Sequence, residues 1–404
     1  MKTTYLNAKP NADQTLLLEK LNDEFYNKYK PIFVYSGPPG SGKTWVIRLF
    51  FEMHHISDDQ FITCAYSGKA ANVLAMNGLP ARTIHSLIYN MELKSTVNQT
   101  TGEIQYTPTF VKKPDLGADY KYIVVDELSM VPDTIMEDLL SFGIPIIGMG
   151  DINQLPPVFG HGSYIAKPDF VLTEIMRQAW DSPIIKMSQY VLHGQKLAYG
   201  SYGNDCNVMR TMPIGRNLLG YDCILCNRNA TRSLVNDIFR SDIMKFCKHF
   251  GKHVPILHVG DKIVCRQNKW DRSLDGLYLT NGTIGTVDYI NDELTDGNKI
   301  TVDFKPDYST GDCFDNIPIS VKYLQDSSVR TFNFGTVNFD YAYALTVHSA
   351  QGSQFNKLLY IDDGFSGDRE IKKKLKYTAI TRAVNHIDIV DGDAFYSYTP
   401  YSGL

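Results

Sequence analysis

Short apolar runs alternate with amphipathic segments over much of this chain. Residues 31–36 form an apolar run rich in β-formers, glycines follow, and residues 44–51 repeat apolar positions at helical spacing. The alternation continues in apolar runs and an Ala-rich helical stretch at 60–65, 69–76, 122–125 and 144–149. Strands that alternate with helices predict a parallel sheet with helices on its faces, so the expected fold class is α/β.

Two segments depart from this alternation. Between residues 90 and 115, β-formers flank Thr100-Thr101-Gly102, which predicts a hairpin inserted in the first sheet domain. Between residues 241 and 334, turn signals separate short β-rich runs, which predicts a small, barrel-like β-domain. The predicted organisation is a first α/β domain at 1–82 and 116–178, a hairpin domain at 83–115, a second α/β domain at 179–240 and 335–404, and a β-rich domain at 241–334.

Composition narrows the class of protein. A length of 404 residues predicts two to three domains at about 150 residues each, and 43% hydrophobic residues are enough for sizeable cores. The 40 basic and 44 acidic residues leave a net charge of −4, which excludes a nucleic-acid-binding protein whose whole surface is basic. Any contact with nucleic acid must therefore be a local groove.

The N-terminus has no apolar run like a signal peptide, and apolar stretches elsewhere are short, so we expect a cytoplasmic protein without a membrane segment. Seven cysteines, an odd and sparse number, indicate reduced thiols. Cys223-Ile-Leu-Cys226 has the spacing of a metal site, but this apolar run predicts a strand, where positions i and i+3 point to opposite faces. We interpret the pair as core packing.

The stretch Gly37-Pro-Pro-Gly-Ser-Gly-Lys43-Thr44 fits the pattern of a phosphate-binding loop. It follows a predicted strand and opens a predicted helix, as that motif requires. The glycines let backbone N–H groups turn toward phosphate oxygens, Lys43 reaches the β- and γ-phosphates, and Thr44 offers a hydroxyl to Mg²⁺. The alternative is a Gly-rich turn without a ligand, which a matching acidic site would disfavour.

Such an acidic site follows the apolar strand at 122–125. Asp126 can hold the Mg²⁺ shell, and Glu127 can orient or deprotonate water. By itself the pair is more often a solvated strand end, but together with the loop at 37–44 it predicts nucleotide hydrolysis. Phosphoryl transfer to a small acceptor, as in metabolite kinases, would not call for a Glu beside the γ-phosphate.

Three further side chains are candidates for the site. Gln154, within residues 150–158, follows another apolar strand, so its amide is expected at the sheet's C-terminal edge, where it can sense the γ-phosphate. Arg177 and Arg382, taken singly, would be interpreted as surface charges.

In their order along the chain, these segments resemble the motif set of superfamily 1 helicases, in the RecD-like branch. The matching segments are Gln14, 37–44, 67–71, 83–86, 125–127, 150–158, 172–178, 344–353 and 377–383. The phosphate loop is common to many families. The segments GD-x-x-QLPPV, ALTVHSAQGS and YTAITRA in this order are specific, and the resemblance runs from residue 14 to residue 383.

The resemblance implies two RecA-like domains that hold ATP between them. It implies that Gln14 reads the adenine, that Gln154 couples the γ-phosphate to the DNA site, and that the two arginines neutralise charge in the transition state. The implied catalytic residues are Lys43, Glu127, Gln154, Arg177 and Arg382; the implied Mg²⁺ ligands are Thr44 and Asp126. The implied nucleotide-binding residues are Gln14, Gly37, Pro38, Pro39, Gly40, Ser41, Gly42, Lys43, Thr44, Gly352 and Gln354.

Single-stranded DNA in this family crosses both domains, and the branch moves 5′ to 3′. The implied DNA contacts are Ser67, Gly68, Lys69, Thr83, His85, Pro157, Val158, Thr346 and His348. Both histidines are equally compatible with a core or interface role. The hairpin occupies the place of a strand-separating pin, with Phe110, Tyr106 and Tyr89 as candidates for the ring at the fork, and residues 241–334 resemble an SH3-like module.

Two positions depart from the family pattern. Relatives commonly have Lys where this chain has Ser349, and Glu where it has Gln354, so a basic contact and a ribose-facing carboxylate are missing. We expect weaker and less salt-dependent strand binding as a result. The run Lys372-Lys373-Lys374 can compensate, although such a run is more often a solvated helix face.

The function expected from this resemblance is an ATP- and Mg²⁺-dependent DNA helicase that moves 5′ to 3′, monomeric, acting on single-stranded and forked DNA with replication or repair proteins as partners. One alternative is an RNA helicase, because some superfamily 1 viral enzymes share the phosphate loop and acid pair. Another is a DNA-stimulated ATPase that clamps DNA or remodels proteins without unwinding. No nuclease-like metal cluster is recognisable in the sequence.

Overall fold

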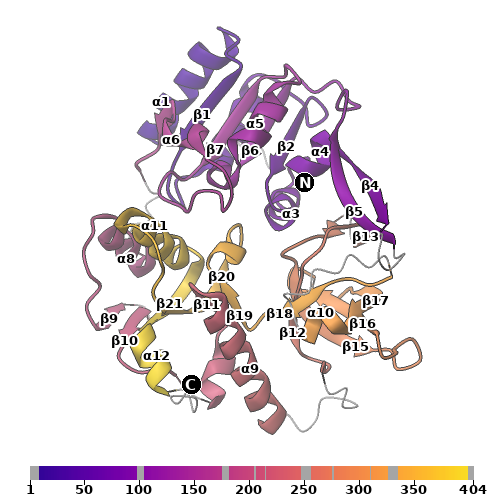
Figure 1. The fold of residues 1–404 in the computed structure, drawn as a ribbon. Helices are drawn as coiled ribbons and strands as arrows, with labels where there is room; N and C mark the ends of the chain where they lie inside the picture. Colours follow the sequence, from indigo (N-terminus) through magenta and orange to yellow (C-terminus); the bar gives the residue numbers. More distant parts are fainter. Residues whose placement is uncertain are drawn as a thin grey trace. The chain divides into compact units, whose positions relative to one another are not determined.

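The computed structural model describes residues 9–97, 104–174, 182–203, 206–213, 215–246, 256–274, 277–309, 311–325 and 335–398. The chain divides into two compact units, Met1–Trp180 and Asp181–Leu404 (Figure 1). Each unit contains a six-stranded sheet, and the second contains a further sheet of five strands.

The first unit is built on a parallel sheet with strand order β3-β2-β6-β7-β1-β8. Its strands are β1 (Ile32–Ser36), β2 (Phe61–Ala65), β3 (Ala81–Thr83), β6 (Tyr122–Asp126), β7 (Ile146–Gly150) and β8 (Phe170–Val171). Ser36 pairs with Gly150, and Ala65 pairs with both Asp126 and Thr83, so the strands end at one level. All segments that follow these strands therefore begin at one edge of the sheet, the carboxyl edge.

Helices cover both faces of this sheet. They are α1 (Ala12–Lys20), the π-helical η2 (Leu21–Tyr26), α2 (Lys43–Met53), α3 (Gly68–Met76), α4 (Ile84–Ile88), η3 (Leu128–Met130), α5 (Asp133–Leu140) and α6 (Ser163–Ala166). Side chains alternate along β1: Phe33 and Tyr35 join one core with residues of α1 and α2, and Val34 joins the other with α4 and α5. Burial on both faces explains why the strands read as continuous apolar runs.

An antiparallel hairpin of β4 (Tyr89–Val97) and β5 (Ile104–Lys112) follows α4 (Figure 1). Tyr89 pairs with Lys112 and Met91 with Phe110, and the turn at 98–103 lies outside the described residues. The predicted insertion begins earlier, at residue 83, and so includes α4. Ile84 and Ile88 of α4 are fully buried in the core of the sheet, so only the two strands leave it.

The second unit contains a sheet of order β19-β11-β20-β21-β10-β9, parallel except for the antiparallel edge strand β9. The strands are β9 (Gly200–Gly203), β10 (Cys206–Met209), β11 (Cys223–Cys226), β19 (Ala344–Thr346), β20 (Phe355–Asp362) and β21 (Ala383–Asp391). The helices are α8 (Pro183–Leu192), η4 (Gly215–Gly220), α9 (Asn229–Phe246), η5 (His348–Ala350), α11 (Arg369–Ile380) and α12 (Gly392–Tyr398).

The segment Cys223–Cys226 is the strand that its apolar run predicts, and all four of its residues are buried. Burial raises the pKa of the Cys226 thiol well above its ordinary value, so this sulfur is an inert core group.

Between α9 and β19 the chain forms an antiparallel sheet of order β17-β16-β15-β12-β18, with a small ribbon of β13 and β14. The elements are β12 (Lys262–Cys265), β13 (Lys269–Leu274), β14 (Leu277–Leu279), β15 (Ile284–Ile290), β16 (Lys299–Pro306), β17 (Phe314–Ser320), α10 (Val321–Gln325) and β18 (Phe339–Tyr341). The sheet extends past the predicted limit at 334, because β18 pairs with β12, and α9 extends past the limit at 240.

This sheet shares one continuous apolar core with α9 and β11 of the second parallel sheet. Phe239 of α9 stacks on Tyr343, with ring centroids 5.0 Å apart. The Asn236 side chain accepts a hydrogen bond from the Ala344 backbone at 2.8 Å. Arg232 pairs with Asp340 of β18. The β-rich segment is therefore packed firmly on the α/β part of its unit.

None of the helices in the described ranges combines the length and the apolar character needed to cross a bilayer.

Candidate functional site

The predicted phosphate loop connects β1 to α2. Gly40 and Gly42 have φ angles of 80° and 81°, in the left-handed region that glycine adopts without strain. Gly42 is the residue before α2, and a Cβ there would lie 2.6 Å from the Gln14 amide nitrogen. The loop therefore needs glycine at this position for its backbone conformation and for space, and it opens the helix N-terminus toward an anion.

Lys43 holds its ammonium inside the loop. Its Nζ donates to the carbonyls of Gly37 at 2.7 Å and Pro38 at 3.3 Å. The Tyr35 hydroxyl donates to the Lys43 carbonyl at 2.9 Å and anchors the first turn of α2. The cation thus lies among the loop's own carbonyl groups, where a bound phosphate would compete for it.

Asp126 ends β6, and Glu127 follows it with φ 50° and ψ 42°. A non-glycine residue in this left-handed region is strained, and such strain concentrates at functional sites. Asp126 accepts the Glu127 backbone N–H at 2.8 Å. Burial and the Glu127 charge together raise the pKa of Asp126 to about 7, although Lys43 and the Glu127 N–H oppose the shift. A carboxylate in this setting gains from a nearby cation.

Gln154 lies in the loop after β7, beside the end of β1. The Ile152 N–H donates to the Ser36 hydroxyl at 2.9 Å, and the Gln154 N–H donates to the Asp151 carbonyl at 3.0 Å. The Gln154 side chain is 4% exposed, and its Oε1 has no hydrogen-bond partner among the described residues. A buried acceptor of this kind calls for a donor, and the described residues do not supply one.

Gln14 lies directly against the phosphate loop. Its Nε2 donates to the Ser41 carbonyl at 3.0 Å, and its Oε1 accepts the Asn11 N–H at 3.1 Å. The Asn11 side chain in turn accepts the Gln14 N–H at 2.8 Å, which completes a capping box at the start of α1. Gln14 therefore lies against the phosphate loop, and its role in reading the adenine stays a prediction.

The predicted DNA contacts of the first unit follow β2 and β3 at the same carboxyl edge. The Ser67 hydroxyl accepts the Ala70 N–H at 3.2 Å and caps α3, and the Thr83 hydroxyl accepts the Ser86 N–H at 3.1 Å and caps α4. Gly68 is buried and Lys69 is partly exposed in the first turn of α3. The loop, the acid pair and these helix starts thus share one edge of one sheet.

Four rings gather between α4 and the hairpin. His85 lies 5.5 Å from Tyr66, 5.6 Å from Tyr89 and 5.4 Å from Phe110, measured between ring centroids. Burial lowers the pKa of His85, so this ring is neutral at neutral pH. Phe110 is 57% exposed, whereas the Tyr89 hydroxyl donates to Asp138. Tyr106 lies on β5, and its side chain lies outside the described residues.

The loop that carries Gln154 ends in an exposed apolar tip. Val158 is 64% exposed and Phe159 is 81% exposed, while Pro157 packs against Gly162, where a Cβ would lie 2.9 Å from the proline ring. The sequence interpretation includes Pro157 and Val158 but misses Phe159 and Tyr66. Only their position in the sequence could have indicated them, because each aromatic residue adjoins a predicted DNA-contact segment.

In the second unit the structure brings two predicted segments together. Arg382 is 4% exposed, its guanidinium donates to the Ser353 carbonyl at 3.4 Å, and its own carbonyl accepts the Phe355 N–H at 2.9 Å. Gly352 turns the chain here with φ 74°, and Gln354 is exposed. Arg177 lies outside the described residues.

The remaining predicted DNA contacts of this unit surround η5. The Thr346 and Ser349 hydroxyls lie 2.9 Å apart, so Ser349, which stands in place of the family's lysine, braces this turn. The His348 ring lies 5.8 Å from Phe365, and burial lowers the pKa of His348.

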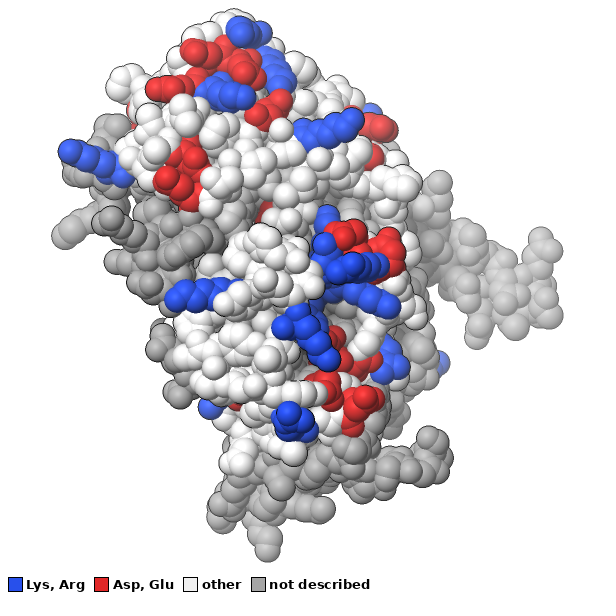
Figure 2. Space-filling view, turned by 90° about the vertical axis from the view of Figure 1, so that its left-hand side faces the viewer, with Lys and Arg blue, Asp and Glu red and all other residues white. Residues whose placement is uncertain are grey.

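The basic run on α11 is partly neutralised by neighbouring acids. Lys373 pairs with Glu370 at 2.7 Å and Lys376 pairs with Asp362 at 2.5 Å, while Lys372 is exposed. Figure 2 shows blue and red side chains interspersed on one face, without a continuous basic surface over the described residues in view. A solvated helix face accounts for most of this run.

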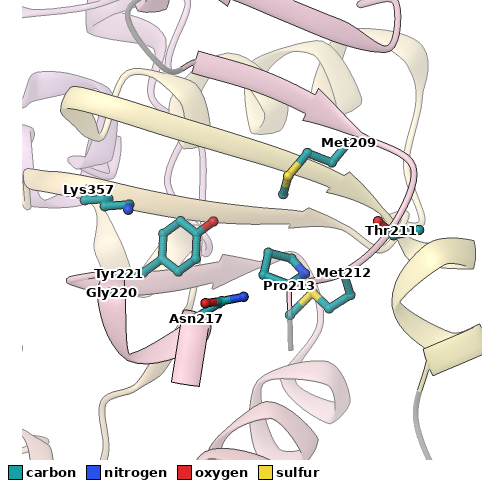
Figure 3. A pocket seen from close by; sticks show the side chains of 8 residues that line it. All are labelled: Met209, Thr211, Met212, Pro213, Asn217, Gly220, Tyr221 and Lys357. Atoms are coloured by element: carbon teal, nitrogen blue, oxygen red, sulfur yellow. The ribbon is translucent and has the colours of Figure 1, made fainter. Parts of the chain in front are cut away.

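A separate cavity of about 510 Å³ lies in the second unit beside Tyr221 (Figure 3). The Tyr221 hydroxyl and the His386 ring both bond Asp388, and Lys357 lies 5.1 Å from the centre of the Tyr221 ring. None of the residues that line the cavity belongs to the predicted site. It is therefore a surface feature distinct from the residues above.

Comparison with known proteins agrees with this geometry. Residues 11–209 match the family model of an AAA domain, and residues 341–388 match that of a UvrD-like helicase C-terminal domain. The ATP-dependent RecD2 DNA helicase of Deinococcus radiodurans is 26% identical over 384 residues, which cover 87% of this chain and 46% of that protein. These matches support the resemblance of this chain to the RecD-like group of superfamily 1 helicases.

A further relative matches a shorter part of this chain. The RecBCD enzyme subunit RecD of Buchnera aphidicola is 27% identical over 170 residues, which cover 41% of this chain and 24% of that one. The chain spans less than half the length of these two relatives.

Two solved helicase structures share the fold. The Pif1 helicase from Candida albicans has a TM-score of 0.53 and 17% identity, with 95% of this chain and 94% of that chain covered. The Pif1 helicase from Bacteroides in complex with ADP-AlF3 and ssDNA has a TM-score of 0.54 and 17% identity, with 94% and 92% covered.

Proposed function

We propose that this chain is an ATP-dependent DNA helicase that moves 5′ to 3′ along single-stranded DNA and separates the duplex ahead. The observation that carries the proposal is that the phosphate loop, Asp126, Glu127 and Gln154 share one sheet edge with the capped starts of α3 and α4. Relatives named as an ATP-dependent DNA helicase and as a helicase bound to ADP-AlF3 and ssDNA support both ligands.

Hydrolysis would use the charge arrangement of the first unit. Thr44 and Asp126 would hold Mg²⁺, which neutralises phosphate charge, and the raised pKa of Asp126 fits a carboxylate whose ionised form needs a cation. Glu127 would take the proton of the attacking water, and the free acceptor Oε1 of Gln154 would orient that water. The backbone of residues 37–42 and Lys43 would surround the phosphates.

Arg177 and Arg382 would complete this site by neutralising charge that develops on the γ-phosphate. The proposed arrangement has two RecA-like domains, at 1–82 with 116–178 and at 179–240 with 335–404, and an SH3-like insertion near 241–334. Burial of Arg382 beside the segment 346–354 supports a pre-organised guanidinium, because its rotamers are already restricted by packing.

Strand contacts would be independent of base sequence. Hydroxyl groups of Ser67, Thr83 and Thr346 suit a phosphate backbone, and exposed apolar groups such as Val158 suit the faces of bases. His85 and His348 would contribute as neutral rings.

Between Phe110 and Tyr89, the two candidates for the strand-separating ring whose side chains the structure describes, we favour Phe110. Its ring is 57% exposed and pairs across the hairpin with Met91, itself 55% exposed, whereas the Tyr89 hydroxyl is engaged by Asp138. An exposed ring beside a flexible apolar side chain can stack against the last base pair of a fork.

The deciding experiment is strand displacement on partial duplexes that carry only a 5′ or only a 3′ single-stranded tail, with ATP and Mg²⁺. The expected result is displacement from the 5′-tailed substrate, with none in Lys43→Ala protein of unchanged circular dichroism. Displacement only from the 3′ tail would reject the polarity. ATP hydrolysis without displacement on either tail would favour a clamp or remodelling ATPase, and stronger stimulation by RNA than by DNA would favour an RNA helicase.

A further inference from the structure

Asp13 makes an unusual set of contacts next to Gln14. One carboxylate oxygen, Oδ2, accepts the Thr173 N–H at 2.7 Å, the Thr173 hydroxyl at 2.8 Å and the Glu174 N–H at 2.8 Å. Partial burial acts to raise the pKa of Asp13, but these hydrogen bonds outweigh it and leave the pKa below its ordinary value. The carboxylate is therefore ionised at neutral pH, and hydrogen bonds to a charged group are the stronger kind.

The helix that carries Asp13, α1, contacts the phosphate loop through the next residue, Gln14. Gln14 is 1% exposed, and its amide donates to the Ser41 carbonyl inside the phosphate loop. The capping box of Asn11 and Gln14 fixes the first turn of α1, so Asp13 and Gln14 move together. If nucleotide binding beside Gln14 moved this turn, Asp13 would therefore move with it.

The segment that Asp13 holds follows β8, the last strand among the described residues of the first unit. The Leu172 N–H donates to the Ser36 carbonyl at 2.8 Å, and a Cβ on Gly37 would lie 3.0 Å from Leu172 Cβ, so the segment borders the start of the phosphate loop. Beyond Glu174 the chain runs to the division between the units at Trp180 and Asp181. Asp13 therefore fixes the backbone of residues 173–174, shortly before the first unit ends at Trp180.

We infer that Asp13 is a positioning residue that couples nucleotide binding at Gln14 and the phosphate loop to the affinity of the protein for single-stranded DNA. It acts by tying the first turn of α1 to residues 173–174. The inference rests on the proposed function, because it requires both ligands. Coupling of this kind is reciprocal: if the nucleotide changes DNA affinity by some factor, DNA changes nucleotide affinity by the same factor.

The test measures the dissociation constant of a short fluorescein-labelled oligothymidylate by anisotropy, with and without a non-hydrolysable ATP analogue. The ratio of the two constants is the coupling factor, which we expect to be about fivefold or more in the wild type, within the usual range of allosteric coupling. In Asp13→Ala it should fall below about twofold, while each ligand alone binds within about threefold of the wild type. Thr173→Val removes one of the three donors and should give an intermediate ratio.

Asp169 provides the matched control. Its carboxylate also accepts a backbone N–H, from Val34 at 2.8 Å, and an ammonium, from Lys30. Lys20 of α1 donates to Asp169 at 3.3 Å, but only to its backbone carbonyl, which Asp169→Ala retains. Asp169→Ala should lose thermal stability yet keep the wild-type coupling factor. An unchanged factor in Asp13→Ala and Thr173→Val, or an equal loss in Asp169→Ala, would overturn the inference. Wild-type protein that does not bind the oligonucleotide would instead refute the proposed function, and the inference with it.

Discussion

At the scale of single residues, Asp126 and its neighbour Glu127 differ sharply in environment although both are acids at the end of one strand. Asp126 shares a crowded, partly buried position with the Glu127 charge, and its pKa is raised to about 7. Glu127 has a left-handed backbone, with φ 50° and ψ 42°. Two adjacent carboxylates are thereby set up for different tasks.

This pKa predicts how stability depends on pH in the absence of nucleotide. The folded protein keeps the Asp126 proton up to about pH 7, whereas the unfolded chain releases it near 3.8, so the associated stability is present below 3.8 and is lost as pH rises through 7. Asp126→Asn should remove this loss and melt at a higher temperature than the wild type at pH 8. Thermal unfolding followed from pH 4 to pH 8 checks this, and parallel curves for the two proteins would contradict it.

Phe159 predicts a second effect at the residue scale. An aromatic ring 81% exposed on a well-anchored loop offers its face to a base, and such stacking contributes about 1–3 kcal/mol per base. Phe159→Ala should therefore weaken binding of single-stranded DNA by about tenfold, and Phe159→Trp should retain it.

The control is Tyr29→Ala. Tyr29 is 83% exposed but precedes β1, at the opposite edge of the same sheet. Anisotropy titrations with an oligothymidylate should show no change for this variant. Equal losses in Phe159→Ala and Tyr29→Ala would show that the Phe159 effect is not local.

At the scale of elements, the hairpin β4–β5 extends from the first unit without packing into the core of its parallel sheet. Its base joins α4, whose apolar residues are in the core, and its exposed face carries Phe110 and Met91. An element with few core contacts is free to serve a ligand. The proposed strand-separating role would place this face at the fork.

Phe110→Ala should accordingly lower the rate of strand displacement by about tenfold and leave DNA-stimulated ATP hydrolysis within about twofold, because loss of one stacked ring costs about 1–3 kcal/mol at the fork alone. Val111→Ala, at the next position of the same strand and 41% exposed, is the matched control and should displace strands normally. Parallel measurement of ATPase and displacement separates the two effects. An equal fall of both rates in Phe110→Ala would argue against a pin.

At the scale of the whole molecule, the proposed catalytic groups come from distant parts of the chain. The phosphate loop lies near the N-terminus, and Arg382 lies after α11, near the C-terminus. The second unit packs Arg382 against the Ser353 carbonyl, so the arginine is held by its own unit before any ligand binds.

Arg382→Lys should lower the rate of ATP hydrolysis by about 10³-fold while the affinity for nucleotide changes by less than about threefold, because an arginine of this type acts on transition-state charge. Single-turnover hydrolysis and binding of a fluorescent ATP analogue measure the two quantities. Arg369→Lys, at the exposed start of α11, the helix that precedes Arg382, should leave both unchanged. If hydrolysis survives in Arg382→Lys, the proposed role fails.

Much of the local structure is predictable from the sequence. The apolar runs at 31–36, 60–65, 122–125 and 144–149 are strands in the structure, because a strand buried on both faces must be apolar at every position. The pattern of the phosphate loop also predicts its backbone conformation. Gly40 and Gly42 adopt left-handed backbone, which only glycine adopts without strain.

Domain boundaries, long-range strand pairing and side-chain exposure were less predictable from the sequence. The predicted hairpin domain includes α4, because local composition does not report that Ile84 and Ile88 pack beneath the sheet. The β-rich insertion extends to β18, because strand pairing between residues 262–265 and 339–341 is a long-range contact with no local signal. Phe159 and Tyr66 were missed for the same reason, since exposure is a property of the folded chain.

The amino-acid sequence by itself determined the α/β class, the phosphate loop, the acid pair and the resemblance to RecD-like helicases, since each depends on local spacing or on the order of motifs. Only the tertiary structure decided that Asp13 holds residues 173–174, that Gln154 buries a free acceptor, and that His85 lies among three other rings. These features join residues far apart in the chain, and their energies depend on burial and distance, which are set when the sheet and its helices pack together.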